Sequence, residues 1–352
     1  MELESNIELE NLASEEEDLD IDTAPFQIHT YGADYTLEIL AKKIDEKEII
    51  IPPFQRLYVW TDKKASKLVE SFLLGLPVPQ IFLYRQEKTE NLLVVDGQQR
   101  LRTIHYFMRG WLENERPFAL RGVKQNWEGK TFMQLDEPDK RRFKNSVMRA
   151  TVFQQTDPKD NSSVFQIFER LNTGGMALTM QEIRNCVTRG KINDFLAKLN
   201  AYSAWRSLLN KQSPDTRMKD VEMILRFLAL YEEWQSYKKP MKDFISNFME
   251  KNKNLNTPTQ NKYEKIFQNA VGFISKEIGS SAFRLTAGTN IALFDALTVA
   301  IAKSDIRKIK DAKIKLEDLK KNPIFVEAVS SHTTDEEKVQ SRIKIALQTF
   351  AK

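Results

Sequence analysis

The spacing of apolar residues divides the chain into two parts. Up to about residue 187, short apolar runs that suit strands alternate with apolar positions at helical spacing, and prolines and glycines separate them. From about residue 188, glycine and proline become sparse and helical periodicity dominates. The pattern predicts the α+β fold class, with a mixed domain over residues 25–187 followed by an all-α helical domain over residues 188–352.

Apolar runs and helix caps predict the individual elements. We expect strands at residues 49–51, 81–84, 92–95 and 147–154, with a hairpin between the second and the third. We expect helices that start after Thr36, after Thr61 or Asp62, after Gly97, at Asp157-Pro158 and after Thr179, and a basic helix at residues 139–145. In the second part, the strongest helical patterns cover residues 221–228, 244–248 and 291–300, and the last should be buried because it is apolar nearly all round.

One junction between a predicted strand and a predicted helix carries unusually many polar groups. The apolar run Leu92–Val95 ends at Asp96, and Gly97, Gln98, Gln99 and Arg100 follow before the next apolar positions. Gly97 permits a sharp reversal, and the amides of a first helical turn attract anions. Arg100 adds a cation, so the turn suits a phosphate group. A purely structural turn is the alternative, but it does not need four hydrogen-bonding side chains.

Two further junctions have a similar composition. Gln55 and Arg56 lie between a predicted strand and a predicted helix, and Arg170 and Asn172 lie at a predicted helix end before Gly174-Gly175. The next helix start adds three polar residues, Gln181, Glu182 and Arg184. Each group taken singly could be a cap with surface charge. Three such junctions in one small domain favour a common cleft.

The familiar catalytic and metal-binding patterns are absent from the sequence. His29, His105 and His332 are far apart and have no zinc-ligand spacing, so an HNH-type nuclease centre is excluded. His105 suits a packed or surface position better than a catalytic base. Cys186 lies beside apolar residues at helical spacing, which favours a buried thiol over a nucleophile. No Walker A motif occurs, so the chain is not a P-loop enzyme.

Composition describes a globular protein of 352 residues, with 41% hydrophobic and 29% charged residues. No apolar run reaches the roughly 20 residues that span a bilayer. The start of the chain is acidic, without the basic and apolar regions of a signal peptide, and a single cysteine excludes an internal disulfide framework. We therefore expect a cytoplasmic protein that does not bind membranes.

Charge is distributed unevenly along the chain. Residues 1–22 contain ten acidic residues and no lysine or arginine, and residues 1–24 should form a disordered acidic tail. The whole chain has 53 basic and 49 acidic residues, so removal of those ten leaves 53 against 39, a net charge of +14. A basic body suits a polyanionic partner such as DNA, although a merely lysine-rich protein would have the same balance.

Several of these motifs occur together in the order of a known family. They are Ile51-Pro52-Pro53-Phe54-Gln55-Arg56, Tyr58-Val59-Trp60, residues 96–100, residues 168–175 and residues 181–185. This set resembles the N-terminal domain family of the GmrSD type IV restriction enzymes, which has a ParB/sulfiredoxin-like fold. The resemblance covers about residues 30–190, and residues 217–222 are similar to the helical continuation of the family.

The resemblance implies that the chain binds and hydrolyses a nucleoside triphosphate with Mg²⁺ and acts in restriction of phage or foreign DNA. Arg100, Gln98 and Gln99 would then hold phosphates, and Gly97 would give backbone access. Asp96 would orient water or the metal ion. Gln55, Arg56, Arg170 and Asn172 would complete the cleft.

The resemblance does not account for DNA cleavage by this chain. Full-length restriction enzymes of this type carry an HNH-type nuclease domain, which the three scattered histidines exclude here. We therefore expect an effector in trans, a separately encoded nuclease or toxin. Two alternatives stay open: a non-enzymatic protein that binds DNA or regulates a partner, and a nuclease that acts at the same cleft.

Overall fold

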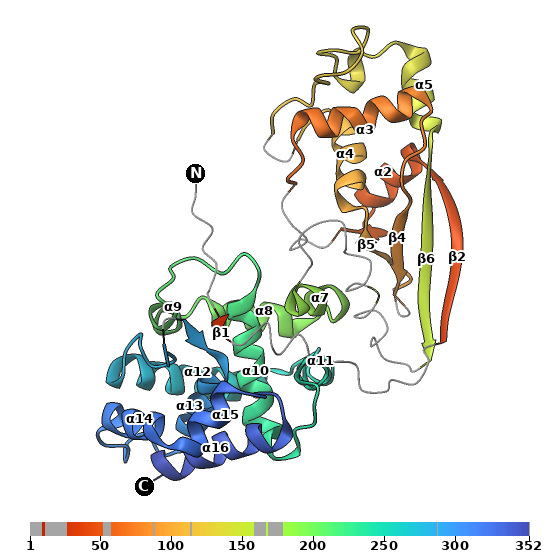
Figure 1. Cartoon of the computed structure of the whole chain (residues 1–352). Coiled ribbons are helices and arrows are strands. Elements are labelled where there is room, and N and C mark those ends of the chain that lie inside the picture. The colour runs from red at the N-terminus through yellow and green to blue at the C-terminus, as the bar shows by residue number, and fades with distance from the viewer. Residues whose placement is uncertain are drawn as a thin grey trace. The chain divides into compact units, whose positions relative to one another are not determined.

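The chain divides into two compact units. The structure is a computed structural model that describes residues 9–10, 27–51, 58–86, 89–112, 115–157, 167, 179–286 and 288–351. Residues 24–178 form one unit, here called the mixed unit, and residues 1–23 and 179–352 form the other, the helical unit. The mixed unit contains a five-stranded sheet and the helical unit is almost entirely helical, so the predicted α+β class is confirmed (Figure 1).

The sheet of the mixed unit combines parallel and antiparallel pairs. Its strands are β2 (Gln27–Thr36), β3 (Ile49–Ile50), β4 (Ile81–Arg85), β5 (Leu92–Asp96) and β6 (Val147–Asp157). They lie in the order β2-β6-β4-β5-β3. The β4–β5 pair is antiparallel, as the predicted hairpin requires, whereas β6 runs parallel to β4 and β3 runs parallel to β5. The apolar runs at residues 49–51, 81–84, 92–95 and 147–154 thus form strands, as predicted.

Strand β2 was absent from the sequence-based prediction. It pairs antiparallel with β6 along ten residues and forms an edge of the sheet. Most of its side chains are exposed, so its sequence lacks the apolar alternation that marks a half-buried strand. Strand β2 is therefore defined by its backbone pairing with β6, which the pattern of apolar residues does not report.

Among the described residues of the mixed unit, four α-helices pack with the sheet around the core. They are α2 (Leu37–Asp45), α3 (Asp62–Leu74), α4 (Gln98–Arg109) and α5 (Glu137–Asn145). The hydroxyls of Thr36 and Thr61 accept hydrogen bonds from the first-turn amides of α2 and α3, as the predicted caps require. Leu37, Ile104 and Phe107 of the helices share one buried core with Leu83 and Val94 of the sheet.

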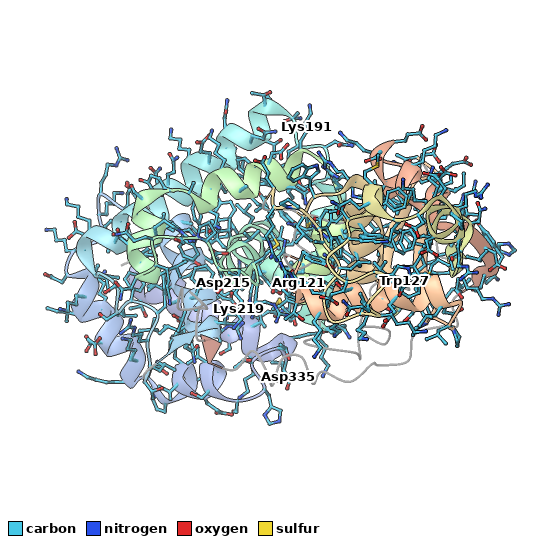
Figure 2. The ribbon with its side chains drawn as sticks, turned by 90° about the horizontal axis from the view of Figure 1, so that it is seen from above. Arg121, Trp127, Lys191, Asp215, Lys219 and Asp335 are labelled. Carbon is cyan, nitrogen blue, oxygen red and sulfur yellow. The ribbon has the colours of Figure 1, made fainter. Side chains whose placement is uncertain are left out.

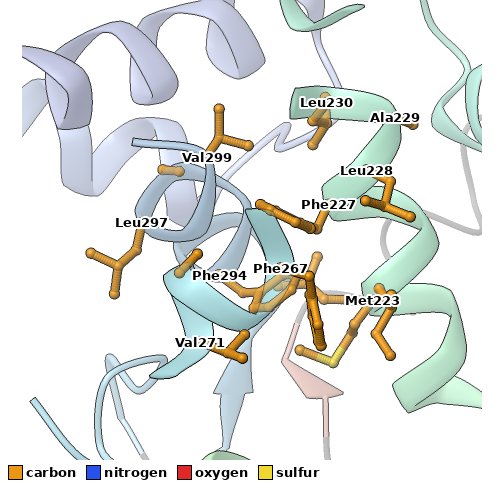
Figure 3. Close-up of a cluster of buried hydrophobic side chains, with 14 of the residues drawn as sticks. Met223, Phe227, Leu228, Ala229, Leu230, Phe267, Val271, Phe294, Leu297 and Val299 are labelled. Atoms are coloured by element: carbon orange, nitrogen blue, oxygen red, sulfur yellow. The ribbon is translucent and has the colours of Figure 1, made fainter. Parts of the chain in front are cut away.

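The helical unit packs its helices around α13. They are α7 (Met180–Val187), α8 (Lys191–Asn200), α9 (Ser203–Leu209), α10 (Lys219–Glu233), α11 (Met241–Lys251), α12 (Thr257–Glu277), α13 (Ile291–Lys303), α14 (Ala312–Lys321), α15 (Pro323–Ser330) and α16 (Glu336–Phe350). Residues 291–301 of α13 are all buried, as its apolar sequence predicts. Figure 3 shows Phe227 of α10, Phe267 of α12 and Phe294 of α13 in this core. No helix among the described residues is long and apolar enough to cross a bilayer.

Helix α7 belongs to the helical unit. We expected the boundary between the two domains at residues 187 and 188, after this helix, and the two units meet at residues 178 and 179, before it. The predicted capping box of Thr179 and Glu182 is present at its start. The guanidinium of Arg184 donates to Glu222 of α10 at 2.9 Å and to Ser246 of α11 at 3.0 Å. These contacts attach α7 to α10 and α11.

A short strand from the acidic N-terminal segment also belongs to the helical unit. Strand β1 (Leu9–Glu10) pairs parallel with β7 (Thr289–Asn290), which directly precedes α13. We expected residues 1–24 to be disordered throughout, and at residues 9–10 the structure differs from that expectation. A backbone ladder needs no apolar side chains, so composition gives no sign of it.

Three charged residues are buried together in the helical unit. Asp295 of α13 is fully buried and accepts hydrogen bonds from Arg226 of α10 at 2.8 Å and from Arg342 of α16 at 2.8 Å. Both guanidiniums are at most 2% exposed. Buried charges of this kind depend on their partners, because each loses its hydration. The carboxylate of Asp295 therefore joins α10, α13 and α16.

The buried carboxylate of Asp295 should be essential for the stability of the helical unit. Asp295→Ala leaves two buried guanidiniums without their carboxylate, which we expect to lower the free energy of unfolding by about 3–5 kcal/mol. Chemical denaturation followed by circular dichroism measures this loss. The control is Asp305→Ala, because Asp305 pairs with the exposed Arg307 at the surface and its loss should leave the denaturation midpoint unchanged. Equal stability of the two variants would contradict the proposed role of Asp295.

Candidate functional site

The turn between β5 and α4 is fixed by contact with the neighbouring strand. Asp96 is the last residue of β5, Gly97 is the N-cap of α4, and Gln98 is its first residue. Gly97 has a φ of 97°, a conformation that favours glycine. A Cβ atom on Gly97 would lie 2.3 Å from Cγ2 of Ile81, the first residue of β4. Both the backbone conformation and the close approach of β4 therefore require glycine here.

Arg100 is held across the end of the sheet. Its Nη2 atom donates to Oδ2 of Asp96 at 2.7 Å and to the carbonyl oxygen of Gln80 at 3.0 Å. The side-chain amide of Gln80 accepts in turn from the hydroxyl of Thr151 on β6, at 3.1 Å. The guanidinium is thus fixed by β5 and by Gln80, the residue before β4, which is itself hydrogen-bonded to β6.

Part of the hydrogen-bonding capacity of Arg100 remains available. Its Nε atom is buried and has no hydrogen-bond partner among the described residues. Its side chain is 18% exposed, and that of Asp96 is 38% exposed. An Nε–H group without a protein partner can donate to an incoming hydrogen-bond acceptor. A fixed guanidinium with this donor can bind an anion at the start of α4.

Gln99 connects the same turn to the segment that follows the predicted Gln55-Arg56 junction. Its Oε1 atom accepts a hydrogen bond from the backbone amide of Val59 at 3.2 Å. Its carbonyl oxygen accepts from the hydroxyl of Thr103 at 2.7 Å, and that hydroxyl is 2.8 Å from the hydroxyl of Tyr58. Gln99 and Thr103 therefore attach residues 58–59 to the first turns of α4.

Burial keeps the Tyr58 hydroxyl protonated. Desolvation raises the pKa of Tyr58 to about 12, although its hydrogen bond with Thr103 acts in the opposite direction. The ring also packs edge-on against Tyr106 at a centroid distance of 5.3 Å. At neutral pH the hydroxyl can therefore donate to Thr103. The sequence gave no role to Thr103, and its only signal was its position four residues after Gln99 on one face of the helix.

The acidic groups at the turn are few. In the part of the chain that the structure describes, no three histidine, cysteine or acidic side chains lie close enough to hold a metal ion together. Asp96 is a single carboxylate, and one of its oxygens is paired with Arg100. Mg²⁺ commonly binds proteins through one or two carboxylates, with water and substrate phosphates as its other ligands. A single carboxylate at this turn is therefore compatible with a metal ion that arrives with a nucleotide.

Of the other residues predicted to line the cleft, some lie outside the described residues and the rest are buried in the helical unit. Gln55, Arg56, Arg170 and Asn172 lie outside the described residues. The polar residues at the start of α7 are held within the helical unit, where Gln181 and Arg184 are fully buried. Arg184 donates to Gln181, Glu222, Ser246 and the carbonyl oxygen of Lys242. The sequence suggested a cleft function for this junction, and the structure gives its side chains a packing function.

Burial is the main cause of the raised pKa values of two side chains on α7, Glu182 and Cys186. Desolvation raises the pKa of Glu182, against the opposing effects of the Thr179 amide and Arg217. Burial also raises the pKa of Cys186 well above its ordinary value. Its thiol is therefore unreactive, as the sequence predicts. The Nε2 atom of His105 is 2.7 Å from Asp45, and its side chain is only 12% exposed, which agrees with the predicted packed or surface position.

Gly97→Ala should test the contact between the turn and β4. We expect a loss of about 2–4 kcal/mol in the free energy of unfolding, because a Cβ atom adds both left-handed backbone strain and overlap with Ile81. Gly110→Ala is the matched control, because Gly110 ends the same helix with a φ of 87° and a Cβ atom there would meet nothing within 4 Å. Denaturant titration should show the larger loss for Gly97→Ala. Equal losses would mean that Ile81 moves away at little cost.

A comparison with known protein families identifies the domain that contains this turn. Residues 37–188 match the family model of the N-terminal domain of the GmrSD restriction endonuclease. No curated protein matches the chain. The matched range begins at the first residue of α2, includes β5 and α4, and ends just after α7. The predicted family resemblance is thereby confirmed, and residues 37–188 are a domain of the GmrSD restriction endonuclease N-terminal family.

Proposed function

We propose that the mixed unit binds a nucleoside triphosphate at the Asp96 turn and hydrolyses it, as part of a restriction system directed against phage or other foreign DNA. The family match supports the restriction role, because GmrSD is a restriction endonuclease. The observation that carries the nucleotide site is Arg100, which is fixed on Asp96 and Gln80 at the first turn of a helix and retains a buried Nε atom with no partner in the described part of the chain. A preorganised cation beside helix amides suits a phosphate chain.

Each residue of the turn would contribute to phosphate binding in a different way. Gly97 has no side chain, so an anion can approach the backbone at the start of α4. Arg100 stabilises negative charge on the phosphates, and the amides of Gln98 and Gln99 donate further hydrogen bonds. Phosphoryl transfer needs charge stabilisation and positioning more than covalent catalysis. A rigid turn with a fixed guanidinium meets this need.

Asp96 is the residue that would hold Mg²⁺, together with the phosphates of the nucleotide. When bound, the metal ion neutralises charge on the phosphate oxygens. The carboxylate of Asp96 can also accept a proton or orient a water molecule, because its side chain is partly exposed and only one oxygen pairs with Arg100. Arg100 in turn orients this carboxylate through its hydrogen bond to Oδ2.

Four further residues complete the proposed nucleotide site on the basis of the family resemblance. They are Gln55, Arg56, Arg170 and Asn172, which belong to the motifs that occur in order with the Asp96 turn. Support for Gln55 and Arg56 comes from their position in the chain. Only two residues after Arg56, the segment Tyr58–Val59 is attached to α4 by Thr103 and Gln99.

Substitutions at the turn should abolish nucleotide turnover without unfolding the protein. Wild-type protein should release phosphate from at least one nucleoside triphosphate in the presence of Mg²⁺. Arg100→Ala should lower the rate about 10²–10³-fold, because it removes a fixed charge-stabilising donor. Asp96→Ala should cause a loss of similar size. A phosphate-release assay over the common nucleoside triphosphates measures both effects.

A matched control separates the site from a general effect on α4. Arg109→Ala removes an exposed arginine from the last turn of the same helix and should leave the rate unchanged. Melting temperatures should show that all three variants are folded. Wild-type protein that neither binds nor hydrolyses any nucleoside triphosphate would refute the enzymatic function, and a non-enzymatic role in binding DNA or a partner would replace it.

The destructive step of the restriction system would come from a partner. We infer a separately encoded nuclease or toxin whose interaction with this chain depends on nucleotide state. The three histidines at positions 29, 105 and 332 support this, because they lack the spacing of an HNH centre. A nucleotide can control such a partner only if its affinity differs between two conformations of the protein.

Coexpression with the neighbouring genes, followed by affinity purification, should detect the effector. We expect one neighbouring gene product to copurify in an amount that changes when a nonhydrolysable nucleotide is added. Arg100→Ala protein should no longer show this change, because it cannot hold the phosphates. If the purified chain degrades DNA or RNA by itself, and Asp96→Ala abolishes that activity, a nuclease at the same cleft replaces the effector in trans.

A further inference from the structure

Phe82 lies on the face of the sheet that points away from the core of the mixed unit. Its neighbours on β4, Ile81 and Leu83, are both fully buried in that core, and side chains alternate between the two faces along a strand. The Phe82 side chain is half-buried, and its ring contacts no other aromatic ring among the described residues. This ring therefore has part of its surface available for a ligand.

A shift in strand register brings Phe82 beside the Asp96 turn. Leu83 pairs with Val94, so a regular antiparallel ladder would place Phe82 opposite Val95. The register shifts between Phe82 and Leu83, and Phe82 pairs with Asp96 instead. Bulges of this kind are common next to functional sites, where they redirect a side chain. Asp96, the last residue of β5, therefore lies directly opposite Phe82.

Gln80 connects the surface around Phe82 to Arg100. On the β6 side, Phe82 pairs with Thr151, whose hydroxyl donates to Oε1 of Gln80 at 3.1 Å. The carbonyl oxygen of Gln80 accepts from Arg100 at 3.0 Å. The Gln80 side chain is exposed, and its Nε2 atom has no hydrogen-bond partner in the described part of the chain. An amide group that is oriented by Thr151 can thus donate to a ligand beside Arg100.

The neighbouring strand β2 leaves space above this surface. Gly32 of β2 pairs with Thr151, so both residues face the same side of the sheet. Gly32 has no side chain, and a Cβ atom built on it would meet no atom within 4 Å. A planar group that lies over Phe82 can therefore extend towards Thr151 without overlap with a side chain at Gly32.

We propose that Gln80, Phe82 and Thr151, here called the sheet subsite, bind the nucleoside part of the nucleotide whose phosphates bind at the Asp96 turn. The inference rests on the proposed nucleotide site and assigns the other half of the same ligand. Gln80 is in contact with Arg100, so the sheet subsite is continuous with the proposed phosphate site. The base stacks on the ring of Phe82, and Nε2 of Gln80 donates to an oxygen of the nucleoside.

The chemistry of the sheet subsite suits a nucleobase. Every base has a π face, and removal of an aromatic side chain that stacks on a base weakens binding by about tenfold or more. The amide of Gln80 is held at Oε1 by Thr151, so little conformational freedom is lost when its Nε2 atom binds a ligand. The ring supplies affinity for the base, and the oriented amide fixes the position of the nucleoside.

Isothermal titration calorimetry on the full chain with Mg²⁺ tests the sheet subsite with two kinds of probe, nonhydrolysable nucleoside triphosphates of the common bases and inorganic triphosphate. Wild-type protein should bind its best nucleotide about tenfold or more tightly than inorganic triphosphate, because only the nucleotide has a base that stacks. Phe82→Leu removes the ring and keeps an apolar side chain, so it should abolish most of this difference without a change in the affinity for inorganic triphosphate. Phe82→Tyr retains a ring and should restore the difference.

Two further comparisons separate the sheet subsite from general effects. Thr151→Val removes the hydroxyl that orients Gln80 and should weaken nucleotide binding about two- to tenfold, whereas Thr151→Ser keeps a hydroxyl and should restore the affinity. Trp111→Ala is the control for loss of an aromatic side chain, because Trp111 is 51% exposed and follows α4, in the same connection as Trp127, which is labelled in Figure 2. This control should bind both probes like the wild type, and melting temperatures should show that all variants are folded.

The two probes distinguish failure of the sheet subsite from failure of the proposed nucleotide site. Equal affinity of wild-type protein for nucleotides and inorganic triphosphate would overturn the sheet subsite and leave the phosphate site in place. Equal losses for both probes in Phe82→Leu would give Phe82 a structural role, and equal losses in Thr151→Val would assign Gln80 to the phosphates, so either result would overturn the assignment. Wild-type protein that binds neither probe would refute the nucleotide site itself, together with this subsite.

Discussion

The contact between Gly97 and Ile81 is the constraint on which the candidate site depends. Strands β4 and β5 are adjacent and antiparallel, so the first residue of β4 lies against the turn that ends β5. Only a residue without a side chain fits there, and this brings α4 close to the sheet. The same approach lets Arg100 reach Asp96 and the carbonyl oxygen of Gln80. A close backbone contact thus positions the cation on which the proposed chemistry rests.

In the helical unit, buried ion pairs determine how the helices are arranged. Its central helix α13 is apolar on nearly all sides, so packing alone would permit several arrangements of its neighbours. Asp295 is the buried exception, and its contacts with Arg226 and Arg342 join α13 to α10 and α16. We regard these ion pairs as a device that specifies one arrangement, because a misplaced helix would leave a buried charge unpaired.

Most elements of the chain could be predicted because their signals are local. The hydroxyls of Thr36 and Thr61 accept hydrogen bonds from amides three residues away, and apolar runs such as residues 92–95 indicate burial directly. Strand β2 and the β1–β7 pair escaped prediction because backbone pairing with a distant segment defines them. Their side chains carry no periodic pattern, so propensity gives no information there.

The sequence by itself determined the α+β class, the family of residues 37–188 and the position of the Asp96 turn, because these depend on residue types at fixed short spacings. Only the tertiary structure decided which polar side chains remain available for a ligand. Arg100 and Arg184 look alike in sequence, since each stands among glutamines and acids at a helix start. Arg184 is fully buried and binds two other helices of its unit, α10 and α11, whereas Arg100, at a partly exposed turn, keeps a donor that has no partner among the described residues. Hydrogen-bond partners are set by the packing of distant segments, and a sequence pattern does not contain that information.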